Sequence, residues 1–158
     1  MENCAIFTIG GFVIYAKSQF VVLTLTMAPA AAGTISGIVK DLKCSPADFD
    51  MIVTGDLGFI GSDILKEYIY KDCGVDISAV HTDCGKLIYY RHEQDVHSGG
   101  SGCGCSASML CSHFLNALEK KKLGRILFVA TGALLSPLTV KQKESVPAIA
   151  HAVVLEGK

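Results

Sequence analysis

The run from His97 to Ser106 (HSGGSGCGCS) contains the residues of this sequence best suited to binding a small anion. Its glycines permit positive φ angles and let the main chain approach a ligand closely. An apolar helix is predicted to follow, and the first free N–H groups of a helix favour negative charge. His97 could donate a hydrogen bond to a carboxylate, or it could only pin Asp95 or a backbone carbonyl. We expect a small-ligand cradle that includes His97, Ser101, Gly102 and Cys103.

Cysteine chemistry is the alternative for this loop. The seven cysteines are odd in number and include no CxxC pair, so a disulfide framework is not expected and the compartment is predicted to be reducing. Cys103 and Cys105 lack the second pair of ligands that a zinc site needs, so no metal site is predicted. A helix N-terminus can lower the pKa of a thiol, but small cysteines in tight loops usually pack. We favour packing for both and assign Cys111 to the core.

Polar residues outside the loop follow predicted strands. Asp56 and Asp83 lie close to glycines and could shape a pocket, hold its loops or coordinate a cation, although turn formation is the simpler interpretation. Thr131, Ser136 and the N–H groups near Gly132 could contact a second carboxylate of a ligand, or they could only close a strand end. Asp56, Asp83, Gly132 and Ser136 complete the predicted ligand-binding set.

Composition limits the class of protein. The chain has 158 residues, a length suited to one domain; 50% are apolar and 18% charged, against roughly a quarter charged in typical domains, so we expect something beyond its own core to cover it. The net charge is −1, and the cluster Glu119–Arg125 suits a helix end, which argues against nucleic acid as a partner. The apolar runs Cys4–Tyr15 and Phe20–Met27 fall short of the roughly 18 residues that span a membrane, and the N-terminus lacks the charge of a signal peptide.

Hydrophobic periodicity predicts an α/β fold. We expect helices over Met27–Lys43 with Pro29 in the first turn, over Ser62–Tyr70, and over Cys105–Lys122, whose wide apolar surface should be buried on more than one side. A functional loop is expected over His81–Asp95. The predicted order is β-α-β-α-β-α-β-β, with a mixed, mainly parallel sheet, helices on both faces and sites at the carboxyl ends of strands. The predicted strands are Cys4–Tyr15, Phe20–Met27, Phe49–Gly55, Val75–Val80, Arg125–Thr131 and Ala148–Glu156.

Short motifs rich in Gly, Ala and Asp follow one another along most of the chain. They are Met27–Ala32, Ile52–Gly58, Asp83–Gly85, Gln94–Ala107, Val129–Pro137 and Ile149–Ala152. Together, in this order, they resemble the stage V sporulation protein AD family, a thiolase-like family of spore-forming bacteria. The resemblance covers Met27–Glu156 and corresponds to the C-terminal half of that family. Residues 1–26 are atypical, so we expect a single half-domain over residues 1–158 whose start is truncated or rearranged.

The resemblance implies one half of a thiolase-like fold, with helix 105–122 in its central layer. It also implies a protein that binds dipicolinic acid, a pyridine with two carboxylates that could be accompanied by calcium, and helps to load it into the developing spore. The implied partners are an N-terminal thiolase half or a homodimer partner, and other spore membrane proteins of the same uptake system. The implied location is cytoplasmic or peripheral to the spore inner membrane.

Condensing relatives use a cysteine nucleophile from the N-terminal half, supported by histidine or asparagine from the C-terminal half. The corresponding loops here would fall at Thr54–Gly58, which has no histidine, and at Gly100–Cys103, which has no asparagine. We therefore expect no catalytic residues and no cofactor. The alternatives are an acyltransferase or ketoacyl synthase fragment whose nucleophile lies on another chain, an interaction module, or a non-functional truncated remnant.

Overall fold

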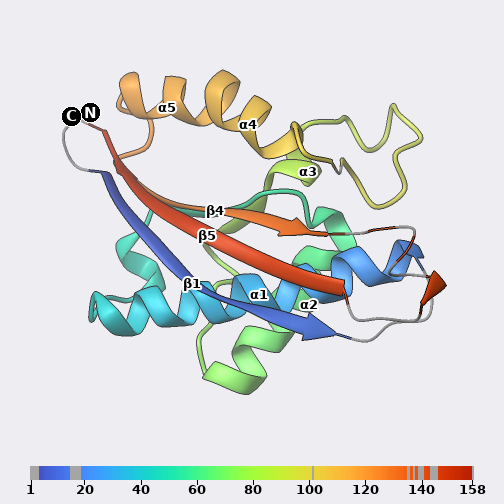
Figure 1. The fold of residues 1–158 in the computed structure, drawn as a ribbon. Helices are drawn as coiled ribbons and strands as arrows, with labels where there is room; N and C mark the ends of the chain where they lie inside the picture. The colour runs from blue at the N-terminus through green and yellow to red at the C-terminus, as the bar shows by residue number, and fades with distance from the viewer. Residues whose placement is uncertain are drawn as a thin grey trace.

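The computed structural model describes residues 4–14, 19–100, 102–134, 136, 138, 141–142 and 146–157, with side chains from residue 26 onward. A five-stranded sheet in the order β1-β5-β4-β2-β3 forms its centre (Figure 1). β2 is parallel to β3 and β4, whereas β5 is antiparallel to β1 and β4. Four strands therefore run in one direction, which confirms a mixed, mainly parallel sheet. The strands are β1 (Cys4–Ile14), β2 (Met51–Thr54), β3 (His81–Asp83), β4 (Arg125–Ala133) and β5 (Val146–Glu156).

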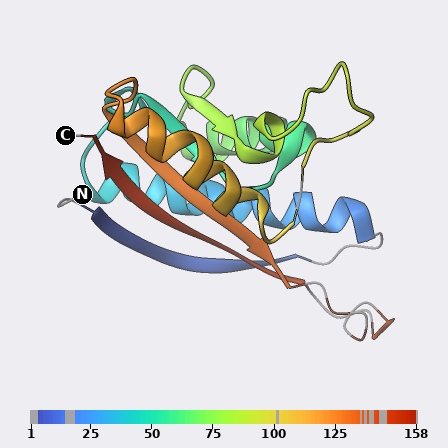
Figure 2. The same cartoon turned by 90° about the horizontal axis from the view of Figure 1, so that it is seen from above.

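Helices cover both faces of the sheet, as Figures 1 and 2 show. α1 (Gln19–Asp41) and α2 (Gly58–Cys73) pack on one face. The other face carries a continuous helical segment made of α4 (Cys105–Met109), the π-helical turn η2 (Leu110–Phe114) and α5 (Leu115–Glu119). Two shorter elements, the 3-10 turn η1 (Pro46–Asp48) and α3 (Cys84–Leu87), complete the set. The predicted α/β class and element order are confirmed.

The two faces of the sheet have separate apolar cores because successive strand residues point to opposite sides. Ile52 of β2 belongs to the cluster formed with α1 and α2, where Ile35, Leu65 and Ile69 are fully buried. The next residue, Val53, belongs to the cluster on the α4–α5 side. None of the helices in the described ranges is both long and apolar enough to cross a membrane.

The predicted strand over Phe20–Met27 is wrong, because this run lies inside α1. Thr24 and Thr26 alternate with Leu23, Leu25 and Met27, and this period of two is typical of a half-buried strand although the segment is helical. Met27 and the alanines at 28 and 30–32 are all buried, as expected for a helix enclosed on several sides. Pro29 accordingly lies within the helix and not in its first turn.

The predicted strand over Val75–Val80 is also wrong, because the third strand is His81–Asp83. α2 extends to Cys73 and ends at Gly74, whose φ of 67° gives the left-handed cap common at helix C-termini. The chain then turns before it pairs with β2, with Thr54 opposite Asp83. The segment expected to be an irregular functional loop therefore begins with a strand.

The helix predicted over residues 105–122 forms, but it is buried on one side only. Cys105, Met109, Phe114 and Leu118 face the core at spacings of four, five and four residues. The π turn absorbs the extra residue and so keeps Phe114 on the inner face. Cys111 is exposed, so its assignment to the core is wrong.

Candidate functional site

Asp83 organises the loops at the carboxyl ends of β2 and β3. Its side chain is fully buried. Its Oδ1 atom accepts the N–H groups of Gly58 at 2.8 Å and Gly85 at 2.9 Å. Its Oδ2 atom accepts the hydroxyl of Thr54 at 2.6 Å and the N–H of Leu57 at 3.0 Å. One carboxylate thus ties the loop after β2 to the loop after β3.

Burial raises the pKa of Asp83, while the hydroxyl of Thr54 and the three backbone N–H donors act in the opposite direction. A carboxylate offers about four lone-pair positions, and these four donors account for all of them. The geometry therefore gives Asp83 the loop-holding role that was one of its predicted alternatives. Among the described residues, no group of three His, Cys, Asp or Glu side chains could hold a metal ion.

Thr54 and His81 extend this network, and sequence reasoning missed both. Thr54 Oγ1 lies 3.0 Å from His81 Nε2. Burial, with a smaller contribution from Lys86 and Lys66, lowers the pKa of His81 to about 3, so the ring is neutral near pH 7. A polar residue at the end of the apolar run Ile52–Thr54 was the available signal, because a buried hydroxyl requires a partner.

Asp56 connects β2, β4 and the glycine loop. Its Oδ1 atom accepts the hydroxyl of Thr131 at 2.8 Å, and its Oδ2 atom accepts the N–H of Gly102 at 3.2 Å. Its own N–H lies 3.4 Å from Thr131 Oγ1. Asp56 thus links the loop after β2 to Thr131 of β4 and to Gly102 of the glycine loop.

The glycine loop packs backbone to backbone against its neighbours. The N–H of Phe59 donates to Ser98 O at 2.7 Å, and the N–H of Gly100 donates to Gly85 O at 2.7 Å. A Cβ atom at Gly58, where φ is 67°, would lie 2.1 Å from Ser98 O. Glycine is required at this position because no side chain fits and few residues adopt this φ.

The loop is less open than the sequence suggests. Its Gly99 N–H donates to Val96 O at 2.7 Å, and those of Gly100 and Gly102 are bonded to Gly85 and Asp56. The amides of these three glycines are therefore occupied, that of Gly99 within the loop and those of Gly100 and Gly102 where the loop docks on the protein. At the start of the helical segment Cys105–Glu119, the N–H of Cys105 donates to Gly102 O at 3.0 Å and that of Ser108 to Gly104 O at 2.9 Å, so the donors left for a ligand are the other N–H groups of the first turn.

The other predicted site residues lie in several settings. The side chain of His97 is 85% exposed, and its Nε2 atom lies 3.7 Å from Asp95 Oδ1, the alternative considered for it. Cys103 is exposed. Gly132 is part of β4 opposite Ile149, and Ser136 Oγ accepts the N–H of Leu138 at 3.3 Å. None of these has a hydrogen bond to Asp56 or Asp83 within the described part of the chain, and Ser101 falls outside it.

The buried thiols of this region are poor nucleophiles. Burial raises the pKa of Cys105 to about 11, and the nearby carboxylates of Asp83 and Asp56 add to the effect. Burial also raises the pKa of Cys84. A thiol attacks as its thiolate, so both groups are inactive near neutral pH. The predicted packing role of Cys105 is confirmed.

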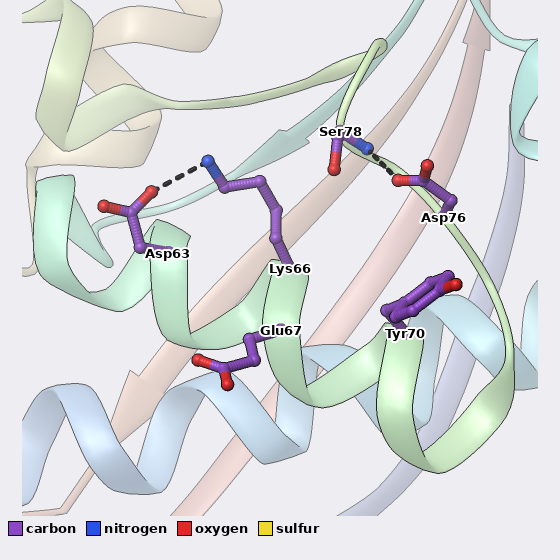
Figure 3. Close-up of a pocket in the computed structure, with 6 residues that line it drawn as sticks. All are labelled: Asp63, Lys66, Glu67, Tyr70, Asp76 and Ser78. Atoms are coloured by element: carbon purple, nitrogen blue, oxygen red, sulfur yellow. Dashed lines mark hydrogen bonds and ion pairs between the residues drawn. The ribbon is translucent and has the colours of Figure 1, made fainter.

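A separate hollow of about 390 Å³ lies along α2 (Figure 3). Its carboxylates are already engaged: Asp63 Oδ1 lies 2.8 Å from Lys66 Nζ, and Asp76 Oδ1 accepts the N–H of Ser78 at 2.9 Å. Glu67 is paired with Lys71 outside the hollow. The lining residues of the hollow are Asp63, Lys66, Glu67, Tyr70, Asp76 and Ser78.

Comparison with known proteins gives one extensive match. The model of the family Stage V sporulation protein AD (SpoVAD) matches residues 2–156. Stage V sporulation protein AD of Bacillus subtilis (strain 168) is 52% identical over 130 residues, which are 82% of this chain and 38% of that protein. The chain thus spans about two fifths of the length of this relative.

Two solved structures show weaker likeness. A fungal type III polyketide synthase, ORAS, is 16% identical with a TM-score of 0.37, over 85% of this chain and 36% of that one. The 3-oxoacyl-[acyl-carrier-protein] synthase III from Aquifex aeolicus VF5 is 13% identical with a TM-score of 0.30, over 87% of this chain and 40% of that one.

Proposed function

Because this chain belongs to the stage V sporulation protein AD family, we propose that it is a catalytically silent thiolase-like protein that binds dipicolinic acid for uptake into the developing spore. The observation that carries the proposal is the meeting of Asp56, Thr131 and the glycine loop at the carboxyl ends of β2 and β4. In open α/β sheets, ligands bind at such ends. This chain contributes one wall of the site.

Preorganisation supports binding at this edge. The four hydrogen bonds to Asp83 and the backbone contacts of Gly58, Gly85 and Gly100 hold three loops in one arrangement. A site that is ordered before the ligand arrives loses less conformational entropy on binding. The backbone donors that follow Gly102 would face one carboxylate of the ligand, since unpaired N–H groups in a first helical turn attract anions.

The protonated thiols support the absence of catalysis. Acyl condensation needs an activated nucleophile, and the raised pKa values of Cys84 and Cys105 leave both uncharged. Cys103 is exposed in the loop, and the Thr54–Gly58 loop provides no histidine to activate a thiol. Binding without covalent chemistry accounts for all these features.

The proposed partners are the N-terminal thiolase half or a second copy of the chain, and other spore membrane proteins of the same uptake system. The exposed outer face of the α4–α5 segment, with Ala107 and Cys111, supports a partner on that side. A position in the cytoplasm or against the spore inner membrane is part of the same proposal.

Isothermal titration of the full chain with dipicolinate tests the proposed function. Gly104 precedes α4, and a Cβ atom there would meet nothing within 4 Å. Gly104→Ala should therefore bind like the unsubstituted chain. Gly104→Asp adds a carboxylate beside the helix start and should weaken binding about tenfold, because like charges repel.

Circular dichroism of both variants provides the folding control, and the uncharged dicarboxamide of the same pyridine provides the ligand control. Equal affinities of the two Gly104 variants for dipicolinate would contradict binding at this edge. So would equal affinities of the unsubstituted chain for the dicarboxylate and the dicarboxamide.

A further inference from the structure

The carboxylate of Asp56 occupies a position that suits an incoming anion. Its Oδ2 atom already accepts the N–H of Gly102, at 3.2 Å, in the loop that the proposed function assigns to the ligand. Resting on that proposed function, we infer that Asp56 is a specificity-determining residue whose carboxylate competes with the ligand carboxylate for the glycine loop. It lowers the affinity for anions and so favours their release.

The competition follows from the number of donors. A backbone N–H carries one hydrogen, so a ligand carboxylate that reaches Gly102 must displace Asp56 or lie beside it. Two carboxylates within hydrogen-bonding distance of one amide are close enough to repel strongly. Asp56 is also held in place, because the Thr131 hydroxyl donates to its other oxygen at 2.8 Å.

The surrounding charges do not relieve this repulsion. The ion pairs of the described ranges are Lys66–Asp63, Lys71–Glu67, His97–Asp95 and Arg125–Glu156, and none includes Asp56. The carboxylates of Asp83 and Asp56 both help to raise the pKa of the Cys105 thiol, which lies at the start of α4. Negative charge therefore reaches the helix start where the ligand would bind.

Weak binding suits a protein that hands its ligand onward. A transported molecule must bind well enough to be captured and loosely enough to leave. A resident carboxylate achieves this without changing the shape of the site. If Asp56 instead held a divalent cation that bridged it to the ligand, a chelator of divalent cations would abolish binding by the unsubstituted chain.

The experiment is titration with dipicolinate of the full chain, Asp56→Asn and Asp41→Asn, in buffer that contains a chelator of divalent cations. Asparagine keeps the shape of the side chain and an oxygen that can accept from Thr131. Asp41 is the matched control. It is exposed at the end of α1, close in sequence to the start of β2, and so lies at the end of the strands opposite to Asp56.

Asp56→Asn should bind about tenfold more tightly than the unsubstituted chain, whereas Asp41→Asn should stay within about twofold of it. The gain should shrink as salt is added, since salt screens charge repulsion and would not alter a steric effect. Asp56→Ser, which also lacks the charge, should show the same direction of change and guards against an asparagine-specific distortion.

The outcomes are distinct. If the unsubstituted chain binds and both Asp56 variants bind equally or more weakly, this inference is overturned and the proposed function stands. If no protein of the set binds dipicolinate, the proposed function is overturned and the inference with it. Binding that emerges or tightens only in the Asp56 variants supports both.

Discussion

The hydroxyl proton of Thr54 determines which groups donate and which accept in the hydrogen-bond network at the ends of β2 and β3. Thr54 has a single hydroxyl hydrogen. The short distance of 2.6 Å between Thr54 Oγ1 and Asp83 Oδ2 indicates that the hydroxyl donates this hydrogen to the carboxylate. Thr54 Oγ1 must then accept from His81, which places the imidazole proton on Nε2. The Nδ1 atom of His81 is buried and has no hydrogen-bond partner in the described structure. Protonating it would place an unpaired charge in the interior.

The free energy of unfolding should therefore decrease as the pH is lowered, because of His81. The pKa of His81 falls from 6.5 in the unfolded chain to about 3 in the folded one. Above pH 6.5 neither state is protonated; below it the unfolded state gains a proton first. The free energy of unfolding should drop as pH falls from 6.5 to 3, approaching about 1.4 kcal/mol per pH unit.

Urea unfolding at several pH values measures this slope. His81→Gln keeps a donor for Thr54 but does not titrate. The free energy of unfolding of this variant should therefore change less steeply over this pH range, by up to about 1.4 kcal/mol per pH unit. His92→Gln removes an exposed histidine and is the matched control. A His81→Gln chain whose stability follows pH as steeply as that of the His92→Gln chain would argue against a buried neutral His81.

Elements meet at this edge through their backbones. The start of α2, the start of α3 and the glycine loop approach so closely that glycine hydrogens face carbonyl oxygens at Gly58, Gly85 and Gly99. Because these segments approach so closely, the glycine loop contacts α2 and α3 through main-chain atoms. The π turn within the helical segment is a second device at this scale, since it restores the inward face after Met109.

Gly58 and Gly74, at the two ends of α2, have the same φ angle. Comparing them separates the cost of a steric overlap from the cost of backbone strain. Gly58 and Gly74 both have φ of 67°, but a Cβ atom at Gly58 would overlap Ser98 O, whereas one at Gly74 would meet nothing within 4 Å. Gly74→Ala should cost about 1 kcal/mol from backbone strain alone. Gly58→Ala should cost about 2 kcal/mol more and displace the glycine loop.

Chemical denaturation of both variants gives the two costs, and hydrogen exchange at the Gly100 amide, which donates to Gly85 O, reports the loop. Exchange at Gly100 should accelerate in Gly58→Ala and remain slow in Gly74→Ala. Similar costs and similar exchange in the two variants would mean that the loop does not dock on α2.

The whole molecule has three layers with unequal outer surfaces. The sheet is buried between α1 with α2 on one side and the α4–α5 segment on the other (Figure 2). The outward face of that segment exposes small residues, including Ala107, Ser108 and Cys111. Its polar groups bond within the helix, as Ser112 Oγ does to Ser108 O at 2.6 Å, which leaves a flat face suited to close packing.

Thiol labelling should detect a partner on this face. Cys111 and Cys73 are both exposed, on opposite sides of the sheet, whereas Cys84 is buried. A maleimide should modify Cys111 and Cys73 rapidly in the isolated chain and leave Cys84 unmodified. A polypeptide that supplies the rest of the relative's length should protect Cys111 but not Cys73, as read by mass spectrometry. Equal labelling of the two in the complex would place the partner elsewhere.

Local patterns were sufficient for the class of fold, the order of the elements and the position of Asp56 just after the carboxyl end of a strand. Each of these follows from where a strand stops and a glycine begins, which neighbouring residues reveal. The loop-holding option for Asp83 was also predictable, although not its full set of donors, because three of the four come from Thr54–Gly58, which lies 25 to 29 positions away in sequence.

Long-range packing determined the remainder. Phe20–Met27 is helical as part of α1, which packs on β1, β4 and β5 and beside α2, although its β-branched residues and its alternation of Leu and Thr favour a strand locally. His81–Asp83 forms a strand because β2 offers it a pairing edge, and the amides of Gly100 and Gly102 are occupied because the loop docks on Gly85 and Asp56. Pairing and docking join residues tens of positions apart, so they depend on the folded chain and not on any local segment.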